Sequence, residues 1–241
     1  MRTLIIVPTY EEAANLPDLL GRIRQSMPDT DILVVDDSSP DGSADLAKRL
    51  AVELGGVDVL VRPEKDGLGN AYRQAFGVAI EQGYEAIVQM DADLSHDPAA
   101  LPGLVAALTD GVGLVIGSRY VPGGLIPHWP WYRRALSRYG NLYTRLALGL
   151  KVRDLTSGYR VWRSSTLQAI DFKSTTSVGY LFQIELAYRV AQLGEGIVEL
   201  PITFVDRVRG YSKMSTAVIY EELSNVTWWG VRDRWRRLRR R

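Results

Sequence analysis

The chain has 241 residues, of which 46% are hydrophobic and 24% are charged, and it contains no cysteine. This composition excludes a disordered chain, a collagen-like repeat, a disulfide scaffold and thiol chemistry, and the absence of cysteine fits a reducing compartment. The net charge is +1, but residues 232–241 hold seven arginines against Asp233, a net of +6, so residues 1–231 carry −5. A mildly acidic body therefore precedes a strongly basic tail.

Short apolar runs alternate with segments of helical periodicity through the first half of the chain. Strands are predicted at residues 3–7, 31–36, 57–61, 86–90 and 113–116, and helices at 13–26, 43–53, 71–81 and 99–108. This alternation predicts an α/β fold, with a parallel sheet covered by helices on both faces. The second half is less regular, with helices predicted at 132–150, 180–193 and 216–241 and strands at 158–162 and 196–204.

The sequence carries no strong membrane or export signal. No segment approaches the ~18 uninterrupted apolar residues of a transmembrane helix. The run Leu4–Val7 is too short for the core of a signal peptide. We therefore expect a cytoplasmic catalytic body whose membrane contact is peripheral.

Parallel sheets bind ligands outside the carboxyl ends of their strands, so the polar loops that follow the strands carry most information. The first strand runs into Pro8-Thr9-Tyr10-Glu11-Glu12, which has neither a glycine-rich dinucleotide turn nor a phosphate-loop pattern. The two glutamates either cap the next helix or form part of a wall for a nucleotide base and ribose. The second strand ends at Asp36, a carboxylate that helix capping does not explain and that could accept a hydrogen bond from a base or a ribose hydroxyl.

The strongest local signal is the pair Asp91 and Asp93 at the end of a hydrophobic strand. In an extended chain, residues two apart point to the same side, so the two carboxylates can converge. Close carboxylates repel each other, and the usual resolutions are a shared proton or a bound cation. Mg²⁺ typically takes one or two carboxylates together with substrate phosphates, so a divalent metal site is predicted. An Asx turn with a helix cap is the alternative, and it is favoured for Asp97 before Pro98.

An ordered set of motifs resembles a known family. Its members here are 7-VPTYEE-12, 35-VDDSSPDG-42, 66-DGLG-69, 90-MDADLSH-96 and 117-GSRY-120, which together look like the GT-A glycosyltransferases of family 2. Two later stretches, 154-DLTSGYR-160 and 179-GYLFQIE-185, resemble dolichol-phosphate (polyprenol-phosphate) mannose synthases. The resemblance spans roughly residues 3–215 and implies the GT-A fold with a mostly parallel sheet.

The resemblance implies an inverting transfer of mannose from GDP-mannose to a polyprenyl monophosphate, assisted by Mg²⁺ or Mn²⁺. The residues that it assigns to the nucleotide sugar are Pro8, Tyr10, Glu12, Asp36, Asp66, Asp91, Ala92, Asp93, Arg119, Arg207 and Lys213. It assigns the lipid phosphate to Arg133 and Ser137, and the sugar site to Gln183 and Glu185. The catalytic set is then Asp91, Asp93, Arg119, Gln183 and Glu185. Some relatives place a metal-binding Gln two residues after the second Asp, whereas this chain has Ser95, so either Ser95 or water is expected as the third ligand.

The chemistry of such an acceptor agrees with the residues present. A phosphate monoester has a second pKa near ~6, so it is mostly ionised at neutral pH without a catalytic base. With only His96 and His128 in the chain, no Ser–His–Asp triad is evident. Arginine forks suit bidentate phosphate contacts, which fits Arg119 and Arg207.

The basic tail has an amphipathic pattern. Trp228, Val231, Trp235 and Leu238 recur at helical spacing among the arginines, which is typical of a helix lying on anionic lipid. We expect a catalytic domain over residues 1–215 and an Arg-rich, membrane-proximal segment over 216–241. A solvated terminus, docking to a membrane-anchoring subunit and nucleic-acid binding are the alternatives, of which we do not expect nucleic acid.

Two other functions are alternatives to this interpretation. The first is a family 2 transferase that uses UDP-glucose or UDP-N-acetylglucosamine on the same lipid. The second is a non-catalytic adaptor that binds a nucleotide or a lipid. Intact Asp91, Asp93, Arg119 and Lys213 argue against the adaptor.

Overall fold

The structure, a computed structural model, describes residues 1–177, 179–206, 224–232 and 235. Seven strands form one sheet in the order β3-β2-β1-β4-β6-β5-β7. Their bounds are β1 (Thr3–Thr9), β2 (Asp31–Asp36), β3 (Val57–Val61), β4 (Ala86–Gln89), β5 (Val112–Ser118), β6 (Arg160–Arg163) and β7 (Gly196–Pro201). Neighbouring strands are parallel, except that β6 runs antiparallel to both β4 and β5. The predicted α/β fold with a mostly parallel sheet is confirmed.

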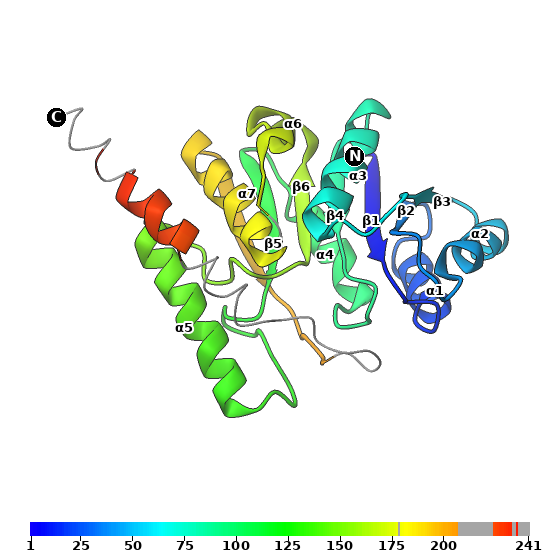
Figure 1. The fold of residues 1–241 in the computed structure, drawn as a ribbon, viewed down its shortest axis with the longest axis horizontal. Helices are drawn as coiled ribbons and strands as arrows, with labels where there is room; N and C mark the ends of the chain where they lie inside the picture. The colour runs from blue at the N-terminus through cyan, green and yellow to red at the C-terminus, as the bar shows by residue number, and fades with distance from the viewer. Residues whose placement is uncertain (178, 207–223, 233–234, 236–241) are drawn as a thin grey trace.

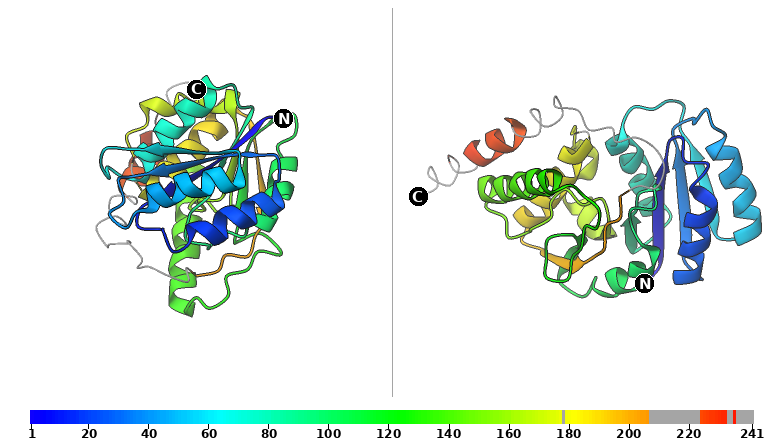
Figure 2. Two further views of the ribbon diagram at one scale, coloured as in Figure 1. Left: turned by 90° about the vertical axis from the view of Figure 1, so that its right-hand side faces the viewer. Right: turned by 90° about the horizontal axis from the view of Figure 1, so that it is seen from below.

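Helices cover both faces of this sheet (Figures 1 and 2). They are α1 (Leu16–Ser26), α2 (Ser43–Leu54), α3 (Leu68–Glu81), α4 (Leu101–Ala106), α5 (Trp131–Leu148), α6 (Ser164–Ala169) and α7 (Gly179–Leu193), with 3₁₀ turns η1 (Pro98–Ala100) and η2 (Phe172–Ser174). Residues 224–232 form a further helix. None of the helices in these described parts of the chain combines the length and the hydropathy needed to cross a bilayer.

The sheet separates two hydrophobic cores, because successive side chains on a strand point to opposite faces. Along β1, Leu4 and Ile6 enter one core, which α3 and α7 cover. Ile5 and Val7 enter the other core, which α1 and α4 cover. A strand that is buried on both faces reads as the continuous apolar run by which it was predicted.

The antiparallel strand β6 decides what meets at the functional edge of the sheet. Arg160, its first residue, pairs with Gln89 near the end of β4 and with Ile116 near the end of β5. The loop that precedes β6 therefore lies beside the carboxyl ends of its neighbours. Apolar periodicity predicts that a strand exists but not its direction, so this juxtaposition could not be derived from the pattern.

Other predicted helices and strands differ from the observed ones. The segment predicted as one helix at 99–108 is the short turn η1 followed by α4, with Asp97 Oδ1 accepting a hydrogen bond from Ala99 N (3.1 Å). The strand predicted at 196–204 leaves the sheet after Pro201, and Phe204 then forms an isolated β-bridge with His96. The last backbone hydrogen bond to β5 is from Ile202 N to Ser118 O (3.1 Å), after which Ile202 O accepts from Leu125 N (3.0 Å). Helix α6 and the turn η2 were not predicted.

The C-terminal helix packs against α5, as Figure 1 shows at the red end of the chain. Tyr143 of α5 and Thr227 share a hydrogen bond of 2.6 Å between their hydroxyl oxygens. Val226 is buried, and the ring of Trp229 stacks on Tyr188 of α7 with 6.2 Å between centroids. The start of this helix therefore belongs to the hydrophobic core. The predicted boundary at residues 215 and 216 lies outside the described residues.

Candidate active site

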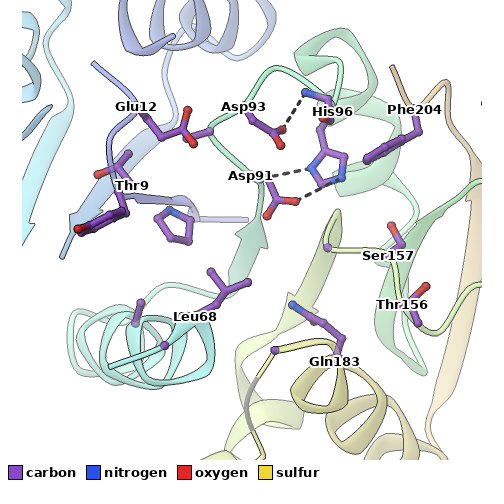
Figure 3. A pocket seen from close by; sticks show the side chains of 18 of the residues that line it. Thr9, Glu12, Leu68, Asp91, Asp93, His96, Thr156, Ser157, Gln183 and Phe204 are labelled. Carbon is purple, nitrogen blue, oxygen red and sulfur yellow. Dashed lines mark hydrogen bonds and ion pairs between the residues drawn. The ribbon is translucent and has the colours of Figure 1, made fainter. Parts of the chain in front are cut away.

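A cavity of about 370 Å³ opens at the carboxyl ends of β1 and β4. Figure 3 shows its centre, where Asp91 and Asp93 lie between Glu12 on one side and Thr156 and Ser157 on the other. The structure thus gathers side chains from the loops that follow β1, β2, β3, β4, β5 and β7, and from the loop that precedes β6, around one space. The predicted residues that line it are Pro8, Tyr10, Glu12, Asp91, Ala92, Asp93, Ser95, Arg119, Arg133 and Gln183.

The two aspartates after β4 share the cavity but differ in environment. The Asp91 side chain is 38% exposed, whereas Asp93 is buried and its Oδ1 accepts a hydrogen bond from Ser95 N (3.1 Å). Gly158 leaves room for this pair, because a Cβ at that position would lie 3.2 Å from Asp91 Oδ2. The buried Ser95 Oγ has no hydrogen-bond partner within the described chain. Two carboxylates and a hydroxyl therefore face the same space.

This oxygen set fits a hard divalent cation that completes its shell from a bound ligand. Mg²⁺ and similar ions take one or two protein carboxylates with substrate phosphates and water. No cluster of three or more His, Cys, Asp or Glu side chains suited to a metal occurs among the residues that the structure describes. The protein alone thus offers a partial set of ligands.

His96 holds Asp91 in place. Its Nδ1 accepts a hydrogen bond from Asp91 N (3.2 Å), and its Nε2 lies 3.9 Å from Asp91 Oδ2. The imidazole is buried and stacks on Tyr159 with 4.8 Å between ring centroids. Burial lowers the pKa of His96, although the negative charge of Asp91 opposes the shift. A neutral imidazole that is already accepting a hydrogen bond is a positioning group rather than a general base.

Arg119, just beyond β5, is oriented by a buried carboxylate. Asp154 is fully buried and accepts hydrogen bonds from Arg119 N (2.9 Å), Nε (2.8 Å) and Nη2 (2.7 Å). Arg119 Nη2 also donates to Thr156 Oγ1 (2.8 Å). This fork holds the planar guanidinium at the cavity wall, where a fixed cation can meet an anionic ligand.

A second buried arginine joins the two segments that close the cavity. Arg160 donates to the carbonyl oxygens of Ser157 (2.8 Å), Leu155 (2.5 Å) and Gln183 (2.7 Å). Burial, partly offset by the charge of Asp154, lowers the pKa of Arg160 to about 9. The 154–158 loop and α7 are therefore held together at the point where Gln183 enters the cavity.

The opposite wall is built around Tyr10. The Lys65 Nζ atom lies 3.5 Å from the centroid of its ring. Asp37 also lines this wall and receives Arg62 Nη1 (2.6 Å), and the same guanidinium is hydrogen-bonded to Asp66. Burial raises the pKa of Asp37 in spite of the opposing effect of Arg62. The aromatic ring and carboxylates needed beside a nucleoside are thus present.

Four predicted residues do not line the cavity. Asp36 is fully buried and accepts hydrogen bonds from Thr9 Oγ1 (2.8 Å), Ser39 N (2.8 Å) and Ser39 Oγ (2.7 Å). Asp66 is held by Arg62, and Ser137 Oγ accepts from the Tyr120 hydroxyl (2.6 Å).

The fourth is Glu185, which is bound by Ser177 and by Arg189 Nη2 (2.7 Å). Residues two apart on a helix face different directions, which separates Glu185 from Gln183. Arg207 and Lys213 lie outside the described residues.

Several cavity residues were not predicted. Asp36 was predicted as a site residue and the neighbouring Asp37 was not. Because side chains alternate between the two faces at a strand end, the pattern gave reason to consider both residues. Asp154, which lies behind Arg119 and does not line the cavity, belongs to a motif but had no predicted role, because its partner is 35 residues away. Trp129 lines the cavity, and the guanidinium of Arg133 lies 3.9 Å from the centroid of its ring.

Comparison with known proteins shows the family to which this chain belongs. The model of the family described as "Glycosyl transferase family 2" matches residues 4–170. The chain belongs to glycosyl transferase family 2. It is 51% identical over 241 residues to an undecaprenyl-phosphate mannosyltransferase from Micrococcus luteus, covering 100% of this chain and 99% of that protein. It is 47% identical over 239 residues to a polyprenol monophosphomannose synthase from Mycolicibacterium smegmatis, covering 99% of this chain and 90% of that protein.

A solved structure has a similar fold. A mannosyltransferase from Pyrobaculum calidifontis, in complex with GDP-Man and Mn²⁺, superposes with a TM-score of 0.62 at 18% identity. The alignment covers 95% of this chain and 69% of that one. The resemblance in sequence motifs and the predicted GT-A fold are both confirmed.

Proposed function

We propose that this family 2 glycosyltransferase moves mannose from GDP-mannose to a polyprenyl monophosphate, giving polyprenyl phosphate mannose and GDP. The observation that carries the proposal is the cavity in which Asp91, Asp93 and Arg119 converge at the strand ends. Full-length similarity to proteins named as polyprenyl-phosphate mannosyltransferases supports the same donor and acceptor.

In this proposal the donor lies across the cavity from the Tyr10 wall to the Arg119 wall. Pro8, Tyr10 and Glu12 contact guanosine, while Asp36 and Asp66 act from behind the wall through Thr9, Ser39 and Arg62. The diphosphate lies near Asp91, Ala92 and Asp93. Arg207 and Lys213 are expected to contribute further cations there.

Asp91, Asp93 and, in part, Ser95 would hold Mg²⁺ or Mn²⁺. The bound ion supplies Lewis-acid stabilisation to the leaving diphosphate. Asp93 is oriented for this by the Ser95 N–H, and Asp91 by His96. The experiment below compares activity with Mg²⁺ and with Mn²⁺.

The acceptor needs no deprotonation by the protein. A phosphate monoester with a second pKa near ~6 is already a nucleophile at neutral pH. Its oxygen attacks the anomeric carbon as the bond from that carbon to the GDP oxygen breaks, with inversion. Arg119 and Arg133 offset the repulsion between the two phosphate groups, with Ser137 acting from outside the cavity through Tyr120. Gln183 serves the sugar side directly, whereas Glu185 acts from behind the cavity wall, where Ser177 and Arg189 bind it.

We also propose that the protein acts at a membrane surface. Residues 1–215 act as the catalytic domain at the cytoplasmic face of a membrane, and residues 216–241 contact its anionic surface. The basic tail and the lipid acceptor support this arrangement. A separate membrane-anchoring subunit would dock on the same side, and nucleic acid is not expected to bind.

The decisive experiment incubates the purified protein with GDP-mannose, a polyprenyl monophosphate and Mg²⁺ or Mn²⁺, and measures GDP release together with mannosyl lipid. We expect both products in equal amounts, with inhibition by GDP and not by UDP. Turnover of UDP-glucose or UDP-N-acetylglucosamine instead would favour the UDP-sugar transferase. Binding of nucleotide or lipid without any product would favour the adaptor.

The matched variants are Asp93→Ala and Asp97→Asn. Asp93→Ala removes a cavity carboxylate, and we expect transfer to fall by about a thousandfold or more with an unchanged fold. Asp97 caps η1 outside the cavity, so Asp97→Asn should keep transfer within about twofold. Wild-type turnover by Asp93→Ala at saturating metal would contradict the assigned role.

A further inference from the structure

A second cavity, of about 220 Å³, is lined mainly by residues of α5. It is lined by Tyr120, Arg138, Asn141, Leu142, Arg145 and Arg153, none of which lines the first cavity. Three arginines around one small groove make a concentrated positive site.

Local geometry explains why these arginines converge. Arg138 and Arg145 are seven residues apart on α5, so they lie on the same face of the helix, two turns apart. Gly149 ends α5 with a left-handed φ of 67°, which turns the chain back and brings Arg153 to the same groove. The arrangement follows from helix periodicity and one glycine turn.

The three guanidinium groups lack acidic partners within the described part of the chain. Neither Arg138, Arg145 nor Arg153 forms an ion pair there, and the guanidinium of Arg138 lies 5.6 Å from the centroid of the Tyr120 ring. Glu199 is close to Arg153 in the fold, but its two oxygens accept the N–H groups of Arg153 (2.7 Å) and Asp154 (2.9 Å). Asp154 itself is engaged by Arg119. The groove therefore has cationic donors available for an external anion.

The surface around the groove is unusually apolar. Leu142 of the groove is 41% exposed, and Tyr139 and Leu146, which lie three and four residues from it on α5, are 69% and 61% exposed. Trp228 and Trp235, on the helix that packs beside α5, are 59% and 61% exposed. Apolar side chains next to cationic heads match the boundary between acyl chains and headgroups of a membrane.

We propose that the groove formed by Arg138, Arg145 and Arg153 binds the phosphate group of an anionic phospholipid, separately from the lipid acceptor. Planar guanidinium forks suit phosphate oxygens, and the apolar residues beside them enter the lipid at the same time. A free phosphate ion would leave those apolar side chains in water. The inference rests on the proposed membrane contact and not on the identity of the transferred sugar.

The test measures binding to phosphatidylcholine vesicles with and without phosphatidylglycerol. Diffuse attraction is worth about fivefold in affinity for each basic residue near the surface, wherever it lies, and treats Lys and Arg alike. A specific phosphate-binding site, in contrast, requires the paired N–H donors of the arginine guanidinium groups, which lysine does not have. We therefore expect Arg145→Gln to cost about tenfold or more, and the combined Arg138→Lys, Arg145→Lys and Arg153→Lys variant also to lose about tenfold.

The matched control is Arg134→Gln, an exposed arginine on α5 that does not line the groove. It should cost no more than about fivefold. Wild-type vesicle binding by the triple Lys variant, or equal losses in Arg134→Gln and Arg145→Gln, would overturn the proposal. Displacement of the wild-type protein from vesicles by millimolar inorganic phosphate would assign the groove to free phosphate and would also overturn it.

Transfer to a short, detergent-soluble polyprenyl phosphate separates this inference from the proposed function. The groove variants should keep that transfer while losing vesicle binding. A wild-type protein that binds the vesicles through the groove but transfers no mannose would leave this inference standing and refute the proposed function.

Discussion

Gln183 is a buried side chain whose polar atoms are left without partners. Both its Oε1 and its Nε2 lack hydrogen bonds within the described chain, although the residue is almost fully buried. An unsatisfied buried amide costs about 1–3 kcal/mol, so a protein keeps one where a ligand satisfies it. Its position across from Asp91, visible in Figure 3, is where the sugar of the proposed donor would lie.

Replacing Gln183 should therefore separate stability from activity. For Gln183→Leu we expect an unchanged free energy of unfolding or a gain of up to about 1 kcal/mol, because the unpaired amide is removed. We expect kcat/KM for mannosyl transfer to fall by about tenfold or more. Urea unfolding and steady-state kinetics measure the two effects. A variant that loses stability and keeps its activity would show that the amide serves the fold.

At the scale of elements, hydrogen bonds from side chains connect separate elements at both ends of the sheet. At the carboxyl end, Arg160 joins the start of β6 to α7 through backbone carbonyls. At the amino end, the Tyr84 hydroxyl, two residues before β4, donates to Asp31 Oδ2 at the start of β2 (2.7 Å). Because β1 lies between β2 and β4, this bond spans β1.

The bond from Tyr84 predicts a specific response to alkaline pH. Burial and the hydrogen bond to Asp31 raise the pKa of Tyr84 to about 12, whereas tyrosine in an unfolded chain titrates near ~10. Between these values the unfolded chain has released a proton that the folded chain retains, so stability falls as the pH rises. We expect the wild type to lose about 2 kcal/mol more than Tyr84→Phe between pH ~10 and ~12. Urea unfolding at both pH values tests this, and parallel profiles for the two proteins would contradict it.

At the scale of the whole molecule, charge and packing divide the C-terminal segment. Residues 1–231 carry −5 and residues 232–241 carry +6. Val226 and Trp229 nevertheless pack into the body, which places the start of this helix in the core and not only at a membrane. The helix formed by residues 224–232 lies beside α5, as Figure 1 shows.

Two truncations follow from this division. Removing residues 233–241 should leave the melting temperature and transfer to a soluble acceptor nearly unchanged while weakening binding to anionic vesicles, because it removes arginines and keeps Val226 and Trp229 in place. Removing residues 224–241 should also lower the free energy of unfolding by about 2–4 kcal/mol, since Val226 and Trp229 leave the core. Thermal melts and vesicle sedimentation measure the effects. Equal loss of vesicle binding and of soluble transfer in the shorter truncation would contradict a membrane role for the basic end.

Local pattern was sufficient for much of the fold. Apolar runs predicted the first five strands almost to the residue, because parallel strands buried on both faces leave a continuous hydrophobic signature. The order of motifs at the strand ends indicated the family, and the polar residues after β1 and β4 indicated where the cavity lies. The pair Asp91 and Asp93 was found because two carboxylates at a strand end have few structural explanations.

The tertiary structure decided which of those polar residues reach the cavity. Asp36 and Asp37 are adjacent in the sequence, yet only Asp37 lines the wall, because Asp36 is satisfied by Thr9 and Ser39. Asp154 orients Arg119 only because the antiparallel β6 brings its preceding loop beside the end of β5. Strand direction and contacts between distant residues depend on how the sheet assembles, which no local periodicity encodes. The division of charge between residues 1–231 and 232–241, by contrast, follows from the sequence alone, whereas only the tertiary structure shows that Val226 and Trp229 pack into the core.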